Sequence, residues 1–125
     1  MAINSYRDLK VWQLSMRLVE DVYSLSARFP KQESFGLVSQ VQRSAVSVPS
    51  NIAEGQARDS TKDYLRFISI ALGSLAELET QLILSNRLTY ITETNLTEIL
   101  EITAEVGRML RGLQKNLKTN LAPSP

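Results

Sequence analysis

Apolar residues between positions 96 and 117 alternate at spacings of three and four, and this pattern is compatible with few structures. The positions, with one threonine among them, are Leu96, Ile99, Thr103, Val106, Leu110, Leu113 and Leu117. An α-helix brings residues with this spacing onto one side, where they form a stripe that packs against other helices. The sequence therefore predicts a long amphipathic helix that belongs to a helical bundle.

Three further segments show helical spacing, and short breaks at residues 29–31, 55–59 and 86–92 separate the segments. The second segment runs from Glu33 to Gly55, and Ser60 and Asp63 resemble a helix cap at the start of the third. Short connections place neighbouring helices antiparallel, so we expect an all-α fold, an antiparallel up-and-down four-helix bundle. We assign residues 1–121 to this single domain and residues 122–125 to a flexible C-terminal tail.

The third and fourth segments have matching patterns. If they form an antiparallel hairpin, three pairs of residues face each other: Leu82 and Leu96, Leu75 and Thr103, and Ile68 and Leu110. This register would bury both stripes along their full length.

The first segment carries two apolar stripes, which is more than a helix of an isolated bundle needs. We expect the first stripe to face the core and the second to leave apolar surface for a partner. The first stripe contains Leu9, Trp12, Met16, Val19 and Tyr23, and the second contains Val11, Leu14, Leu18, Val22 and Leu25. We expect Trp12 to anchor the core against the second helix, so that its truncation to alanine costs about 3 to 5 kcal/mol.

Composition argues against most catalytic and metal chemistry. The chain has no cysteine and no histidine, which removes thiolate nucleophiles, the commonest general base and the commonest metal ligand. Phosphate-binding loops, nucleophile elbows and metal-binding motifs are also missing. We therefore expect no enzymatic activity, no cofactor and no metal. The sequence shows no apolar signal region and no membrane-length apolar run, so we expect a cytoplasmic protein without a membrane partner.

The second segment has a polar stripe that is unusual in its composition. Gln40, Ser44, Ser47, Asn51 and Glu54 share one side of the helix, with Arg43 and Ser50 alongside, and Gly73, Ser74, Glu77 and Gln81 form a matching stripe in the third segment. One interpretation is a solvated face. We favour a polar seam between helices or subunits, because solvated helices are usually richer in lysine and glutamate. The candidate seam residues are Gln40, Arg43, Ser47, Asn51, Glu54 and Glu77.

Within this seam we expect Arg43 and Glu77 to approach each other as a partly buried pair that fixes the helix register. Removal of Glu77 would then leave Arg43 uncompensated, and stability or assembly would fall.

A row of basic residues lies near the C-terminal end of the fourth segment. Arg108, Arg111, Lys115 and Lys118 follow at spacings of three, four and three, and no acidic residue follows Val106. The row is a candidate nucleic-acid contact. The alternative interpretation is a favourable interaction of basic side chains with the helix dipole. The net charge of only +1 supplies no general attraction for polyanions.

Several motifs together resemble a known family. They are the run from Asp8 to Gln13, Phe29-Pro30, Gly36-Leu37, the run from Ser47 to Gly55 that includes Pro49, and the run from Gly73 to Leu82. The chain resembles the four-helix-bundle proteins encoded in intervening sequences of bacterial large-subunit (23S) ribosomal RNA genes. It is also similar to the accessory variability proteins of diversity-generating retroelements. The resemblance implies a homopentamer and a partner that is RNA or an RNA-handling protein.

Two functions remain open from the sequence. The first is a non-enzymatic, oligomeric structural or adaptor protein associated with ribosomal RNA or an RNA-handling partner. The alternative is a weak, sequence-independent nucleic-acid-binding protein that uses the basic row of the fourth helix.

Overall fold

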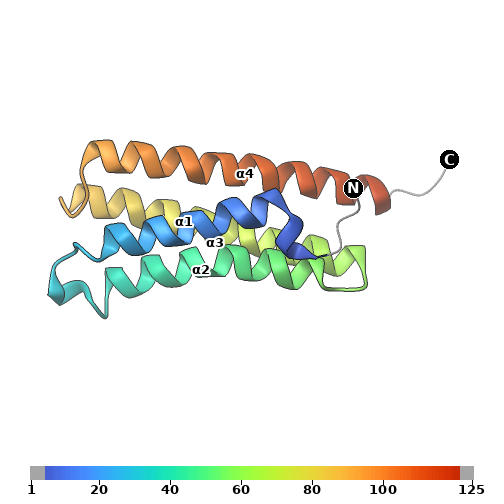
Figure 1. The fold of residues 1–125 in the computed structure, drawn as a ribbon, viewed down its shortest axis with the longest axis horizontal. Helices are drawn as coiled ribbons and strands as arrows, with labels where there is room; N and C mark the ends of the chain where they lie inside the picture. Colours follow the sequence, from blue (N-terminus) through green and yellow to red (C-terminus); the bar gives the residue numbers. More distant parts are fainter. Residues whose placement is uncertain (1–4, 122–125) are drawn as a thin grey trace.

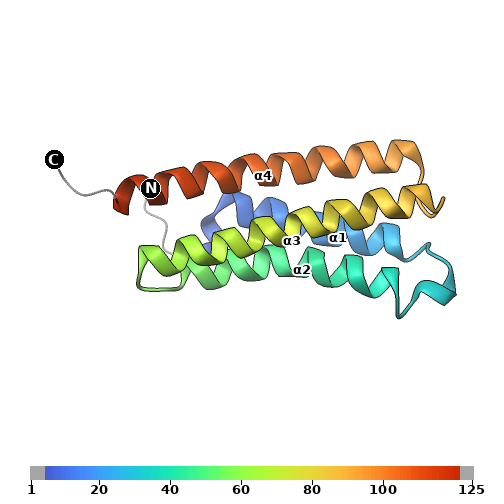
Figure 2. The same cartoon turned by 180° about the vertical axis from the view of Figure 1, so that it is seen from behind.

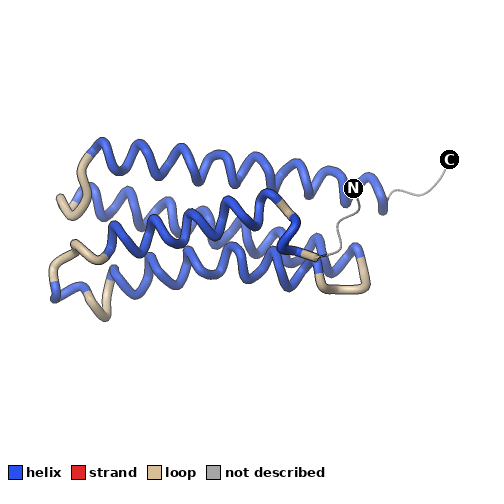
Figure 3. Tube along the Cα trace, viewed as in Figure 1, coloured by secondary structure: helices blue, strands red, loops and turns tan. Residues whose placement is uncertain are grey.

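The computed structural model describes residues 5–121, and four helices run alternately up and down through this part of the chain (Figure 1). The helices are α1 (Lys10–Ser26), α2 (Leu37–Gln56), α3 (Thr61–Arg87) and α4 (Glu93–Leu121), and two short 3₁₀ turns, η1 (Tyr6–Asp8) and η2 (Lys31–Glu33), precede α1 and α2. No strand occurs in the described residues (Figure 3). The predicted all-α antiparallel bundle is confirmed, while the predicted tail at 122–125 lies outside the described residues.

Each helix packs against its two neighbours, so the bundle closes through contacts between α1 and α4 (Figures 1 and 2). The six residues of the predicted facing pairs are all buried: Ile68, Leu75, Leu82, Leu96, Thr103 and Leu110. The printed contacts between the two helices lie one turn away from the predicted Leu75–Thr103 pair, since Thr103 meets Glu79, and Leu75 Cδ2 lies 3.5 Å from where a Cβ of Gly107 would stand. The Thr103 hydroxyl donates a hydrogen bond to a Glu79 carboxylate oxygen at 2.8 Å, which joins α4 to α3 near the middle of both helices. The predicted helix cap at the start of α3 also forms, because Ser60 Oγ accepts from the Asp63 amide at 3.0 Å.

A pair of side chains ties together the α1–α2 and α3–α4 connections at one end of the bundle. Glu33 Oε1 accepts from the Leu37 amide at 3.2 Å and so caps α2, which begins at Leu37 and not at Glu33 as expected. Glu33 Oε2 accepts from the Tyr90 hydroxyl at 2.9 Å, and the Tyr90 ring packs on Phe29 with 5.4 Å between centroids. The hydrogen bond to Glu33 raises the pKa of Tyr90, so the hydroxyl remains a donor into the alkaline range.

The orientation of α1 is the reverse of the one expected from its two stripes. Val11, Leu18 and Val22 of the second stripe are buried in the core, whereas Met16 and Tyr23 of the first stripe are exposed. The prediction was wrong because the two stripes lie side by side and have similar hydrophobicity, so helical spacing could not decide which one faces inward. The apolar surface left for a partner is therefore on the Met16 and Tyr23 side.

The expectation that Trp12 anchors the core is wrong for the same reason. Trp12 is only partly buried, packs against the core from the side, and meets the Tyr6 ring edge-on at 5.3 Å between centroids. The expected cost of truncation therefore falls below the range given for a fully buried aromatic side chain.

Among the described residues, α3 is the one helix that is long and apolar enough to cross a membrane. Core helices of soluble bundles can be equally long and apolar, and α3 contributes Ile68, Leu75, Leu78 and Leu82 to the buried core. These contacts account for its hydrophobicity without a bilayer.

Gly55 allows α2 and α3 to approach closely where the chain turns between them. A Cβ at this position would lie 2.8 Å from Phe67 Cβ and 3.3 Å from the Tyr64 carbonyl oxygen. We predict that Gly55→Ala destabilises the protein by about 1 to 3 kcal/mol, because the backbone must shift to relieve the overlap. The matched control is Gly112→Ala in α4, where a Cβ meets nothing within 4 Å, and a gain of about 0.5 to 1 kcal/mol is expected. Urea unfolding of both variants tests this, and effects of the same sign would contradict it.

Candidate functional site

The polar stripes of α2 and α3 form a hydrogen-bonded seam inside the subunit. Ser44 Oγ donates to Gln81 Oε1 at 2.7 Å, and both side chains are buried. The hydroxyls of Ser47 and Ser74 lie 2.8 Å apart, and Asn51 Nδ2 donates to the Ser47 carbonyl at 2.7 Å and to its hydroxyl at 2.9 Å. The structure thus places Ser47 at the contact of α2 with α3, while Asn51 bonds within α2 and holds the Ser47 hydroxyl in place.

The charged and long polar members of the candidate seam lie at the edge of this network or outside it, and the one printed link is a long bond of 3.4 Å that Gln81 Nε2 donates to Glu77 Oε2. Gln40, Arg43, Glu54 and Glu77 are all exposed. Glu54 pairs with Arg58 at 3.0 Å, an exposed i,i+4 pair of small energetic value. Arg43 and Glu77 line the same surface hollow but form no ion pair in residues 5–121, because both side chains extend into solvent. The expected partly buried ion pair between Arg43 and Glu77 does not form in residues 5–121. The buried contact at this place is the hydrogen bond between Ser44, the residue after Arg43, and Gln81, one turn after Glu77.

A cluster of exposed apolar residues lies along the edge between α1 and α2. Phe35, just before α2, is 100% exposed, and Tyr23, Met16 and Val46 are 46%, 40% and 39% exposed. Tyr23, Phe35 and Val46 line one hollow together with Ser39 and Gln42 among others. We call Met16, Tyr23, Phe35 and Val46 the α1–α2 face. Sequence periodicity missed Phe35 because it lies in a connection and belongs to no stripe.

Further exposed apolar side chains lie along one side of α3 and just after its end. They are Ile70 and Leu84 in the helix and Leu88 at its C-cap, which are 41%, 44% and 43% exposed, and we call these three residues the α3 face. Gly73 lies on the same exposed side of α3 and has open space around it. The helix is therefore flat at this point, and a second helix could approach it closely.

The predicted basic row is exposed along its whole length. Arg108, Arg111, Lys115 and Lys118 all reach solvent, and Arg108 forms an ion pair with Glu105. Charge is segregated along α4, because Glu93, Glu98, Glu101 and Glu105 occupy its first half and the four basic residues its second half. This order also matches the helix dipole, which favours acidic residues near the N-terminus and basic residues near the C-terminus.

In the part of the chain that the structure describes, no three acidic side chains gather closely enough to hold a metal ion. The surface features found there are the two apolar faces, the basic row and the hollows between helices.

Comparison with known proteins identifies the family of this bundle. Residues 7–112 match the sequence profile of the family described as 23S rRNA-intervening sequence protein. The chain belongs to this family. A search of curated proteins gave no match.

The fold is similar to that of a solved structure of another small bacterial protein. It is the crystal structure of a protein of unknown function from the S23 ribosomal protein family of Bacteroides thetaiotaomicron, with a TM-score of 0.78 and 26% sequence identity. The alignment covers 84% of the present chain and 95% of that chain. The resemblance to the intervening-sequence proteins is therefore confirmed at the level of family and fold. Neither match bears on the similarity to the accessory variability proteins of diversity-generating retroelements, and the argument for function rests on the surfaces.

The seam makes a prediction about stability. Ser44→Ala leaves the buried Gln81 Oε1 without its donor and should cost about 1 to 3 kcal/mol. Ser50→Ala, at an exposed position of the same helix, is the matched control and should change stability by less than about 0.5 kcal/mol. Glu77→Ala removes only the longer 3.4 Å bond from Gln81 Nε2 to an exposed carboxylate and should cost much less than Ser44→Ala. Chemical denaturation measures all three, and a loss for Glu77→Ala as large as that for Ser44→Ala would contradict this account.

Proposed function

We propose that this protein is a non-enzymatic structural protein that associates with itself into a closed ring and acts as an adaptor for an RNA-handling partner. The observation that supports it best is Phe35, which is 100% exposed beside the exposed Tyr23 and Val46. A large aromatic side chain in full contact with water gains free energy when a second surface covers it.

A second copy of the chain is the simplest occupant for the α1–α2 face. The α3 face offers exposed apolar side chains of its own and comes from a different helix. When two distinct faces of one chain contact each other, the contact is head-to-tail, and its repetition closes a ring when the rotation divides a full turn and forms an open filament when it does not. The family resemblance suggests five subunits.

Self-association can be tested at Phe35. Phe35→Ser removes the most exposed apolar side chain of the α1–α2 face and should shift the mass from an oligomer toward the 14.0 kDa of one chain. The control is Leu121→Ser, which removes an apolar side chain that is 49% exposed at the end of α4 and outside both faces. Light scattering at micromolar concentration reports the mass. A monomeric wild type, or an oligomer unaffected by Phe35→Ser, would contradict the proposal.

A second candidate function, direct RNA binding, is favoured by the exposure of the basic row. Within the described residues Arg111, Lys115 and Lys118 form no ion pair, so their charges are available to phosphates. One chain offers only a few such charges, but a ring would repeat them and convert weak contacts into useful avidity. The family name links these proteins to 23S rRNA.

This candidate predicts binding that is independent of RNA sequence and falls steeply with salt, because it depends on counterion release. Replacement of Arg108, Arg111, Lys115 and Lys118 by glutamine should abolish binding of a structured RNA at low salt. The control replaces Arg7, Lys10 and Arg17, basic residues of the N-terminal part of the chain, by glutamine. Filter binding at low and physiological salt measures the difference. Equal binding by wild type and the α4 variant would leave the structural role as the only candidate.

A further inference from the structure

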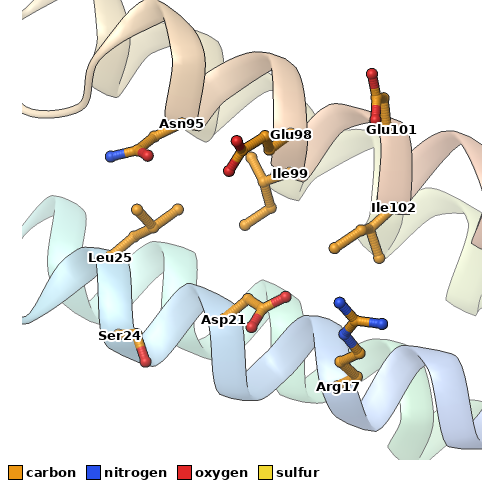
Figure 4. A pocket seen from close by; sticks show the side chains of 9 residues that line it. All are labelled: Arg17, Asp21, Ser24, Leu25, Asn95, Glu98, Ile99, Glu101 and Ile102. Carbon is orange, nitrogen blue, oxygen red and sulfur yellow. The ribbon is translucent and has the colours of Figure 1, made fainter.

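The side of the bundle between α1 and α4 contains a groove that neither apolar face nor the basic row uses (Figure 4). It has a volume of about 470 Å³. The residues that line it are Arg17, Asp21, Ser24 and Leu25 of α1 and Asn95, Glu98, Ile99, Glu101 and Ile102 of α4. It lies opposite the edge of α1 that carries Met16 and Tyr23, so an occupant would leave the α1–α2 face free.

The floor of the groove is apolar. Figure 4 shows Leu25 on α1 directed toward α4, and Ile99 and Ile102 on α4 directed toward α1. Ile99 is 3% exposed and continues into the core, whereas Leu25 and Ile102 are only partly buried. The two partly buried side chains leave apolar surface that another apolar side chain can cover.

The rim of the groove is acidic. The carboxylates of Asp21 and Glu98 face the open space, and Glu101 lies at the outer edge (Figure 4). Arg17 is the single basic residue, so one positive and three negative groups give the rim a formal charge of −2. None of these four groups takes part in an ion pair in residues 5–121, where the pairs are Glu54 with Arg58, Asp63 with Arg66 and Glu105 with Arg108.

The charge and shape of the groove select among possible occupants. RNA is disfavoured, because phosphates would be repelled by the rim. A second copy could offer the basic half of α4, but Leu110 and Leu117 of that half are buried in its own core and Met109 and Leu113 are partly buried, so its exposed apolar side chain is Leu121, at the very end of the helix. A suitable occupant carries positive charge and free apolar side chains on the same short segment.

We propose that the α1–α4 groove binds an amphipathic helical segment of another protein, in which apolar residues at helical spacing are flanked by lysine or arginine. The apolar side chains would cover Leu25 and Ile102, and the basic side chains would meet Asp21 and Glu98. This is the helix-in-groove type of recognition, with the acidic rim providing charge selectivity. The proposal does not depend on ring formation, because one chain supplies the whole groove.

A labelled synthetic peptide tests the proposal with the intact protein. The probe is a helix of leucines at spacings of three and four with lysines at the remaining positions, and a peptide of the same composition with its leucines scattered is the comparison. Fluorescence anisotropy at about 0.1 M salt should show binding of the first peptide at least about tenfold tighter than the second, since only the first presents an apolar side to the floor.

Three variants locate the site. Replacement of Asp21, Glu98 and Glu101 by their amides should weaken binding of the amphipathic peptide about tenfold. Arg17→Glu should tighten it severalfold, because the rim becomes more acidic; a gain cannot come from misfolding. The control neutralises Glu20, Glu54 and Asp59, exposed acidic residues elsewhere on the surface, and should leave binding unchanged.

The outcomes separate this site from general attraction between charges. Equal binding of both peptides, equal loss in the control variant, or no gain with Arg17→Glu would each overturn the proposal. If a second copy of the protein occupies the groove, it displaces the peptide, and the anisotropy falls when unlabelled protein is added beyond the amount that saturates the peptide. This result would also overturn the proposal.

Discussion

The hydrogen bond between Ser44 and Gln81 is the interaction on which the arrangement of surfaces depends. It joins two buried polar groups across the interface of α2 and α3, and either group alone would be costly to bury. Because these partners meet in only one relative position of the helices, the bond fixes their register. The polar stripe of α2 is thereby used inside the subunit, and contacts with other molecules must use the remaining sides of the bundle.

The fold could be predicted from sequence because helical spacing and short connections leave few alternatives. The alternation through Thr103 and the matching stripe of α3 correctly identified which residues of the last two helices are buried, although Thr103 meets Glu79 and not the predicted Leu75. The rotation of α1 could not be predicted, because both of its stripes are apolar and the choice depends on packing against three other helices. Phe35 was missed for a related reason, since a connection has no periodicity to reveal exposure.

Arg43 and Glu77 show a further limit of sequence reasoning. Their positions along α2 and α3 do bring them to one hollow, as antiparallel spacing predicts. Opposite charges that line one hollow do not ensure a buried ion pair, because long charged side chains remain hydrated when they can reach solvent. The shorter Ser44 and the amide of Gln81 take the buried positions. The two apolar faces, the basic row of α4 and the acidic groove between α1 and α4 lie on separate parts of the surface. Each is suited to a different kind of partner.

The central claim is that the α1–α2 face of one copy contacts the α3 face of the next. Because the chain has no cysteine, single cysteines can report this contact directly. Ser34 lies beside Phe35, and Arg87 lies one turn after Leu84 at the end of α3, at the same end of the bundle; both are exposed, and their replacement keeps the apolar side chains of the two faces. Coexpressed Ser34→Cys and Arg87→Cys chains should therefore form a disulfide between copies under mild oxidation, while each variant alone remains monomeric on a denaturing gel. Disulfide-linked dimers of Ser34→Cys alone, or none in the mixture, would contradict the account.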